Sequence, residues 1–266
     1  MIENPRAAVV RAASKLQKRT ARSSTGLFLL EGPQALSEAV AFRRDCIEDV
    51  FVTADAAERV HGIVASIRGQ IRVHEVSDRV LESLADTVSP QGVVAVCKQF
   101  PTSLDAAVTA ESKLVAILHE IRDPGNLGTI IRVADAAGAD AVIVTASSVD
   151  VFNPKVVRAT TGSLFHLPIV IGVSTQTAID ACQARGQQIL AADIAGDDLL
   201  QAVKTGSLEP RSAWVFGNEA RGLPEEVLDV VDVSIAVPNY GHAESMNLAT
   251  AASVCLYQSA FAQRSL

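Results

Sequence analysis

The second half of the sequence alternates between short apolar runs and amphipathic stretches. The runs Leu114 to His119, Ala141 to Thr145 and Ala213 to Phe216 have the length of buried strands. The stretches between such runs, for example Leu127 to Ala137 and Gln176 to Arg185, repeat apolar residues at helical spacing. Repeated strand and helix units of this kind are typical of a mostly parallel sheet that helices cover on both faces.

The last of these units contains a long polar loop. Val233 to Val237 alternates like the end of a buried strand, and Pro238 ends it. From Met246 to Ala262 the apolar residues recur at helical spacing, and Ser245 is positioned to cap that helix. A loop that follows a strand and opens onto a helix N-terminus is a common ligand site in α/β sheets.

The first hundred residues predict a smaller α/β unit. We expect a first strand that begins at Leu27 and ends in a turn at Pro33. Three further strands are expected at Val50 to Thr53, Ile71 to Val76 and Pro90 to Cys97. The expected helices between them are Gln34 to Phe42, Ala56 to Ile67 with Asp55 as its cap, and Val80 to Ala85. Lys98 to Lys113 loses periodicity and is the expected linker. The predicted domains are therefore residues 1–105 and 113–266.

Composition agrees with this fold class. Of the 266 residues, 48% are hydrophobic and only 4% are aromatic, so the core is built mainly of Ala, Val, Leu and Ile. The net charge is -7, yet residues 1–22 carry +5, which leaves -12 for the remainder. The basic segment repeats apolar residues at helical spacing, so it is either a helix with a solvated basic face or a contact for phosphate.

Other features exclude several classes of protein. The four cysteines form no C-x-x-C pair and the five histidines form no metal-ligand motif, so we expect neither disulfides nor a metal. No apolar run approaches the roughly 20 residues of a membrane span, and the N-terminus lacks the apolar block of a signal peptide. We therefore expect a cytoplasmic protein.

Polar residues follow three expected strands of the second domain. Asp123 to Arg132 contains Asn126 as the expected helix cap, and it places Arg132 on the face away from the sheet. The simplest structural interpretation of Arg132 is an exposed pair with Asp135. Phe216 to Pro224 contains Gly217 and Gly222, which permit a tight turn, with Glu219 between them. With the loop after Val237, these turns predict one shared site.

Together these turns resemble a known family. The motifs are N-L-G-x-x-x-R from Asn126, F-G-N-E-x-x-G-L from Phe216 and V-P-N followed by S-M-N-L from Val237. They resemble, in the same order, the three motifs of the SpoU (TrmH) branch of SPOUT methyltransferases. The stretches around Glu31 and Gln91 resemble the substrate-binding domain, similar to ribosomal protein L30, that many members carry. The resemblance thus covers nearly the whole chain.

The resemblance implies a ribose 2′-O-methyltransferase that uses S-adenosylmethionine and acts on RNA. It also implies an α/β knot in the C-terminal domain and a homodimer whose active site is completed across the interface. The implied cofactor contacts are Gly217, Gly222, Val237, Ser245 and Met246. Arg132 corresponds to the catalytic arginine, organised by Asn126, Glu219, Ser245 and Asn247. Val237, Asn239 and Met246 stand where the family often has isoleucine, methionine and leucine, and Asn239 is the polar change.

Two questions stay open at this stage. Arg132 either accepts the proton of the ribose hydroxyl or stabilises the developing alkoxide, and a guanidinium rarely gives up its own proton. In the leading hypothesis the RNA target is rRNA, and the alternative target is tRNA. A further alternative is that the protein binds RNA without catalysis. A dinucleotide oxidoreductase is disfavoured because no G-x-G-x-x-G follows the first strand of either domain.

The residues expected to contact RNA are Arg11, Lys15, Lys18, Arg19, Lys155 and Arg158. For Lys155 and Arg158 the alternative is a solvated face of a helix.

Overall fold

The computed structural model describes residues 1–264, and its contacts group them into two compact units. The first unit consists of Met1–Phe100 and Phe152–His166, and the second consists of Pro101–Val151 and the chain from Leu167 onward. The domain boundaries expected from the sequence stay a prediction. The units differ from them in two respects, because residues 101–112 belong to the second unit and residues 152–166 group with the N-terminal unit.

The first unit contains a four-stranded sheet in the order β1-β4-β2-β3. Strand β4 is antiparallel to both β1 and β2, whereas β2 and β3 are parallel. The strands are β1 (Leu27–Glu31), β2 (Ile47–Val52), β3 (Arg72–Glu75) and β4 (Val93–Lys98). The helices are α1 (Ala8–Ser14), α2 (Arg19–Thr25), α3 (Pro33–Phe42), α4 (Ala54–Arg59), α5 (His61–Ile67), α6 (Asp78–Leu84) and α9 (Pro154–Thr160), with short 3₁₀ turns at Lys15–Gln17, Arg44–Cys46 and Ser163–Phe165.

The basic N-terminal segment is packed onto its own unit. The apolar stripe expected from the spacing was Ala8, Val9, Ala12, Ala13 and Leu16, and only Ala13 and Leu16 of these are buried. The buried face consists of Val10, Ala13 and Leu16, each at most 3% exposed, in the cluster that contains Phe51. Arg22 is also buried, and its guanidinium donates to the carbonyl oxygens of Leu16 and Gln17 at 2.9 Å. Arg22 therefore stabilises the turn between α1 and α2, and its charge is withdrawn from the basic surface.

One helix of this unit differs from the sequence prediction. The expected helix from Ala56 to Ile67 is divided into α4 and α5 at Val60. The cap is Thr53, whose hydroxyl accepts from the N–H of Ala56 at 3.4 Å, so the assignment to Asp55 was wrong. Asp55 lies in the first helical turn, where a carboxylate is still favourable.

The second unit contains a six-stranded sheet in the order β10-β8-β9-β5-β6-β7, and every neighbouring pair in it is parallel. The strands are β5 (Leu114–Leu118), β6 (Ala141–Val144), β7 (Ile169–Ile171), β8 (Gln188–Asp198), β9 (Ser212–Phe216) and β10 (Val233–Ala236). The helices are α7 (Leu104–Ala107), α8 (Pro124–Ala137), α10 (Thr175–Ala184), α11 (Leu199–Lys204), α12 (Glu225–Leu228) and α13 (Leu248–Arg264). The predicted parallel α/β architecture is confirmed.

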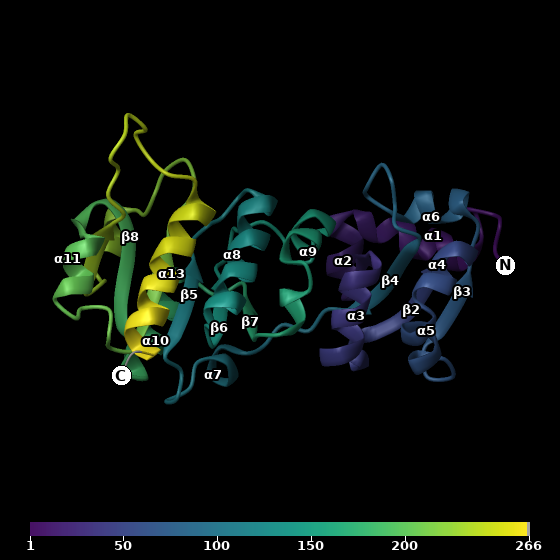
Figure 1. Cartoon of the computed structure of the whole chain (residues 1–266), viewed down its shortest axis with the longest axis horizontal. Helices are drawn as coiled ribbons and strands as arrows, with labels where there is room; N and C mark the ends of the chain where they lie inside the picture. The colour runs from purple at the N-terminus through teal and green to yellow at the C-terminus, as the bar shows by residue number, and fades with distance from the viewer. Residues whose placement is uncertain (265–266) are drawn as a thin grey trace. The chain divides into compact units, whose positions relative to one another are not determined.

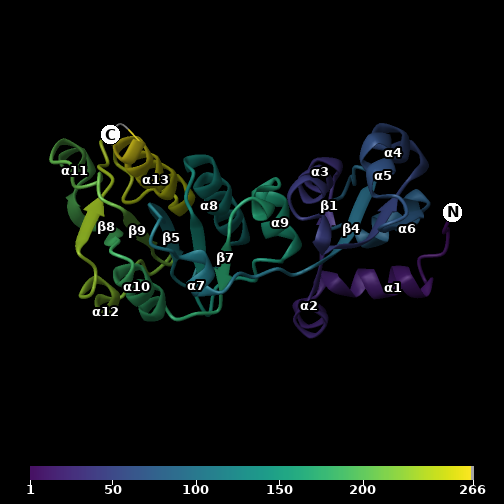
Figure 2. The ribbon, with the colours of Figure 1, turned by 90° about the horizontal axis from the view of Figure 1, so that it is seen from below.

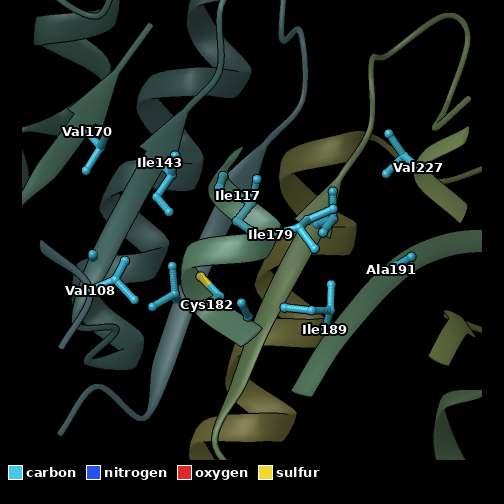
Figure 3. Packing of buried hydrophobic residues seen from close by; sticks show 14 of the residues in the cluster. Val108, Ile117, Ile143, Val170, Ile179, Cys182, Ile189, Ala191 and Val227 are labelled. Atoms are coloured by element: carbon cyan, nitrogen blue, oxygen red, sulfur yellow. The ribbon is translucent and has the colours of Figure 1, made fainter. Parts of the chain in front are cut away.

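Helices cover both faces of this sheet, with α8 and α13 on one side and α10 and α12 on the other (Figures 1 and 2). On the second side, alternate strand residues such as Ile117, Ile143 and Ile189 pack against Ile179 and Cys182 of α10 (Figure 3). Ala107 and Val108 join the same cluster. Two residues of the expected linker are therefore part of the core. No helix in residues 1–264 is long and apolar enough to cross a membrane.

The opposite face of the sheet is stabilised by one buried polar contact. Trp214 of β9 has no exposed surface, and its indole N–H donates to the hydroxyl of Ser259 on α13 at 2.8 Å. Ser259 is equally buried. A large indole can be placed in the core because this hydroxyl satisfies its only donor.

Replacing Ser259 by alanine leaves the Trp214 indole N–H without its partner in the core. We expect Ser259→Ala to lower the free energy of unfolding by about 1–3 kcal/mol, measured by urea denaturation. Ser253→Ala is the control, because the hydroxyl of Ser253 bonds only to the Ala249 carbonyl one turn back in α13. Equal stability of the two variants would contradict this role for the Trp214 contact.

Candidate active site

The strand order brings several loops to the same edge of the second sheet. Strands β6 and β7 lie on one side of β5 in the sheet, and the later strands β9, β8 and β10 lie on its other side. The strand order therefore reverses at β5. Ligands of open α/β sheets bind at such a point, outside the carboxyl ends of the strands. The loops after β5, β8, β9 and β10 all begin at this edge because the strands are parallel.

Glu219, in the loop after β9, anchors the loop after β5. Its carboxylate accepts from the backbone N–H groups of Arg122 at 3.1 Å and Asp123 at 3.0 Å, and from the side-chain amide of Asn126 at 3.3 Å. Burial raises the pKa of Glu219, but hydrogen bonds from these groups and from its own backbone outweigh burial, so the pKa lies below its ordinary value. Glu219 is thus a charged acceptor between two loops.

Asn126 extends this contact to the third loop. Its side-chain oxygen accepts from the amide of Asn247 at 3.0 Å. The side-chain oxygen of Asn247 in turn accepts from the N–H groups of Ala249 at 2.9 Å and Thr250 at 3.3 Å, at the start of α13. Glu219, Asn126 and Asn247 therefore form a continuous chain of hydrogen bonds, named here the polar chain, which joins all three sequence motifs.

Both helix caps expected in these motifs were wrong by a few residues. Asp123 caps α8, since its carboxylate accepts from the Asn126 N–H at 2.7 Å and the helix begins at Pro124. Asn247 caps α13, which begins at Leu248, so Ser245 lies in the loop before it. In each case a competing cap residue stood close by in the sequence, and tertiary contacts determined which one is used.

A cavity of about 380 Å³ lies beside the polar chain. It is bounded by the ends of β8 and β10, the loop after β9 and the loop before α13. The structure brings together here all five residues expected to contact a cofactor: Gly217, Gly222, Val237, Ser245 and Met246. Glu219 and Asn239 also line the cavity. In residues 1–264 no group of three or more His, Cys, Asp or Glu side chains could hold a metal ion.

The two glycines make the loop after β9 unusually compact. Asn218 and Gly222 exchange backbone hydrogen bonds of 3.0 and 2.9 Å, and Gly222 has a φ of 66°. A Cβ atom added to Gly217 would lie 2.5 Å from the carbonyl carbon of Gly222. Both positions therefore require glycine for the observed backbone, whatever the cavity binds.

Sequence reasoning did not identify three other contributors to this edge. Asn218 donates to the Glu120 carbonyl at 2.8 Å, and its own side-chain oxygen accepts from the N–H groups of Ala220 and Arg221. Arg221 forms a 2.9 Å ion pair with Glu120. The end of β8 lines the cavity with Asp193 and Ile194. Asn218 stood inside a quoted motif, whereas the long extension of β8 had no hydrophobic signal.

Arg132 lies away from the cavity of its own chain. It is exposed on α8, and it is absent from the cavity lining. It lies eight positions after Pro124 at the helix start, which is roughly 12 Å along the axis. Within residues 1–264 it forms no ion pair, including none with Asp135, so the simple exposed pair expected from the spacing is not present.

The residues expected to contact RNA lie in the first unit. Arg11, Lys15, Lys18, Arg19 and Lys155 are exposed. Arg158 is half-buried in α9, where it forms a 2.8 Å ion pair with Asp86 and lies 3.7 Å from Glu31. Arg158 is therefore already engaged within its own unit.

Two family models match the chain. Residues 113–257 match the SpoU rRNA Methylase family, and residues 7–95 match the MRM3-like substrate binding domain. The first match spans more than half of the chain.

Curated relatives match over nearly the full length. The chain is 30% identical over 259 residues to the 23S rRNA (guanosine(2553)-2'-O)-methyltransferase RlmP of Bacillus subtilis, covering 96% of this chain and 97% of the relative. It is 31% identical over 252 residues to the 23S rRNA (uridine(2479)-2'-O)-methyltransferase of Streptomyces viridochromogenes, covering 91% of this chain and 85% of the relative.

Solved structures give the same result. The SpoU methyltransferase AviRb from Streptomyces viridochromogenes, in complex with AdoMet, superposes with a TM-score of 0.85 at 28% identity, covering 97% of this chain and 100% of AviRb. An AdoMet-bound rRNA methyltransferase from Sinorhizobium meliloti superposes with a TM-score of 0.84 at 30% identity, covering 97% and 96%. These matches confirm the predicted family and fold class, and the chain belongs to the SpoU rRNA methylase family.

Proposed function

We propose that this protein transfers a methyl group from S-adenosylmethionine to a ribose 2′-hydroxyl of 23S rRNA. The observation that carries the proposal is the polar chain, which unites the three family motifs beside a cavity. The names of both relatives specify 2'-O-methylation of 23S rRNA, which supports rRNA over the tRNA and non-catalytic alternatives. The direct test is tritium transfer from labelled cofactor to unmodified 23S rRNA, followed by mapping of the methylated ribose.

The cavity suits this cofactor in size and in lining. Its volume of about 380 Å³ is in the range of small-molecule sites. Ile235, Val237 and Leu248 provide apolar surface of the kind a purine needs. Within residues 1–264 the backbone groups of Gly217 and Met246 form no hydrogen bond, so they remain available to the polar edges of a ligand. Two relatives of known structure are described as bound to AdoMet.

The bound cofactor supplies an electrophilic methyl group on a sulfonium sulfur. The residues of this chain have to align the ribose hydroxyl with that methyl group and manage the hydroxyl proton. The polar chain fixes the three loops in one arrangement before substrate binds. A guanidinium is a poor proton acceptor, so we assign Arg132 the role of stabilising the developing alkoxide.

We also propose that the protein acts as a cytoplasmic homodimer with a trefoil-knotted second unit. Arg132 is exposed and does not line the cavity of its own chain, which supports a site completed by the Arg132 of a second copy. Tyr240 and Met246 of the loop before α13 are 85% and 36% exposed, which supports a surface that another molecule covers.

Removing the Arg132 guanidinium should stop methyl transfer without affecting the cofactor site. We expect Arg132→Ala to lower the single-turnover rate by about 10²–10³-fold, with an unchanged Kd for S-adenosylmethionine in calorimetry. Arg185→Ala, at the end of α10 on the other face of the sheet, is the control. Wild-type activity of Arg132→Ala would remove this residue from the mechanism. Recovered activity in mixed dimers with a cofactor-deficient chain would show that Arg132 acts in the partner's cavity.

Neutralising Glu219 should disconnect the loops around the cavity. In Glu219→Gln the new NH₂ group lies among the N–H groups of Arg122 and Asp123 and the amide of Asn126, which are also donors. Because these contacts hold the loops beside the cavity, we expect the Kd for the cofactor to rise roughly tenfold or more. Since the pKa of Glu219 is lowered, the stability it contributes is present above its unfolded pKa and is lost as the pH falls through the folded value. The difference in Tm between the wild type and Glu219→Gln should therefore shrink only in that acid range. Glu225→Gln, exposed in α12, should match the wild type throughout.

The exposed basic residues of the N-terminal helices should contribute salt-dependent RNA binding. Deleting the segment would uncover the core that Val10 and Leu16 fill, so we replace Arg11, Lys15, Lys18 and Arg19 with glutamine instead. We expect the slope of log K against log salt for 23S rRNA to become shallower by about 3, at roughly 0.7–0.9 for each lost phosphate contact. An unchanged slope in filter-binding assays would exclude this surface, and Arg68→Gln is the control.

A further inference from the structure

A second hollow lies within the first compact unit and shares no lining residue with the cavity described above. Its volume is about 340 Å³, which is enough for one nucleoside-sized group. It is bounded by the turn between β1 and α3, the loop before β4 and the end of α9. Its polar lining includes Glu31, Gln34, Thr87, Ser89, Gln91 and Arg158.

The charges at this hollow are compensated. The Glu31 carboxylate accepts from the Thr87 hydroxyl and from the Asp86 N–H, and Arg158 pairs with Asp86 at 2.8 Å. Arg59 donates to the backbone carbonyl of Gln91 at 3.3 Å. Two carboxylates and two guanidiniums therefore lie around the hollow, so it has no excess positive charge to hold a phosphate. A neutral group with donors and acceptors suits it better.

Two hydrogen-bonding groups at the hollow have no partner. The side-chain amide of Gln91 is exposed and forms no hydrogen bond with residues 1–264. Nη1 of Arg158 is buried and also forms no hydrogen bond in this part of the chain, since Glu31 lies 3.7 Å away. An amide can donate and accept at once, as the edge of a nucleobase requires. Buried donors without partners are rare and indicate a missing acceptor.

The loop before β4 also presents an apolar side chain to solvent. Val88 is fully exposed, at 101%, and its neighbours Thr87 and Ser89 both line the hollow. Apolar side chains at such loop tips separate stacked bases when a protein deforms a nucleic acid. Thr161, at the opposite wall, has a φ of 49°, a conformation that a β-branched residue adopts only when its surroundings impose it.

We propose that this hollow receives one unstacked nucleobase of the RNA substrate, with Gln91 reading its edge and Val88 occupying the space it leaves in the stack. Sequence-specific RNA recognition generally uses such unstacked bases. The proposal rests on the proposed function, which makes RNA the substrate, and the match of residues 7–95 to a substrate-binding domain agrees with it. It assigns base recognition to the first unit, separate from methyl transfer.

The test uses the full-length protein and unmodified, transcribed 23S rRNA as the probe. We expect Gln91→Ala and Val88→Ser each to raise the Kd for this RNA, and its KM, roughly tenfold. The rate at saturating RNA and the Kd for S-adenosylmethionine should not change, because neither residue lines the cofactor cavity. Chemical probing of base edges should reveal one base that the wild type protects on binding, and Gln91→Ala and Val88→Ser should leave that base reactive.

Gln70→Ala, an exposed glutamine of the same unit outside the hollow, is the matched control and should bind like the wild type. Unchanged Tm values for all variants would exclude misfolding as the cause of weaker binding. If the wild type methylates 23S rRNA but Gln91→Ala and Val88→Ser bind it normally, the hollow is not a base site and the proposed function stands. If the wild type binds 23S rRNA without methylating it, the binding measurements still decide the proposal for the hollow.

Discussion

The candidate active site depends on one ionised carboxylate that faces only donors. Glu219 accepts from two backbone N–H groups and one side-chain amide, so it can be satisfied only when the loop after β5 lies against the loop after β9. Asn126 then passes the same constraint to Asn247 and the start of α13. Because each link is an ordinary hydrogen bond between residues more than ninety positions apart, the arrangement exists only in the folded unit.

This constraint explains why the cavity is preorganised without being rigidly enclosed. The loop after β9 is held by its own backbone pair and by Asn218, whereas the loop before α13 makes only weak internal contacts of 3.3 and 3.4 Å through Asn239. The loop after β9 is therefore held along its length, whereas the loop before α13 is held by the polar chain at its end, at Asn247, and is freer to adjust along the rest. That division suits a site that must admit a cofactor and then present it to a large substrate.

Much of this could be predicted from the sequence, because the strands and helices of the second unit follow strong periodic patterns. Gly217 and Glu219 were found because they interrupt those patterns with residue types that need a reason, whereas Met246 was found through the resemblance of its motif to the family. The assignments of Ser245, Asn126 and Asp55 as helix caps were wrong because Asn247, Asp123 and Thr53, which stand close by, are also favourable cap residues. The stretches around Glu31 and Gln91 resembled a substrate-binding domain, but the sequence did not show that they form one hollow, because its walls come from three separate segments.

The connection between β6 and β7 has a consequence for how the protein can be divided. Residues 152–166 leave the second unit and pack within the first, where the ring of Phe152 lies tilted against that of Phe28 of β1, with 4.9 Å between the ring centroids. A fragment that begins at Pro101 would therefore carry helix α9 and the 3₁₀ turn after it without the first unit, and buried residues such as Val156, Val157 and Phe165 would become exposed. Exchange of modules between homologues would have to transplant this insertion together with the first hundred residues, and a single junction would not suffice.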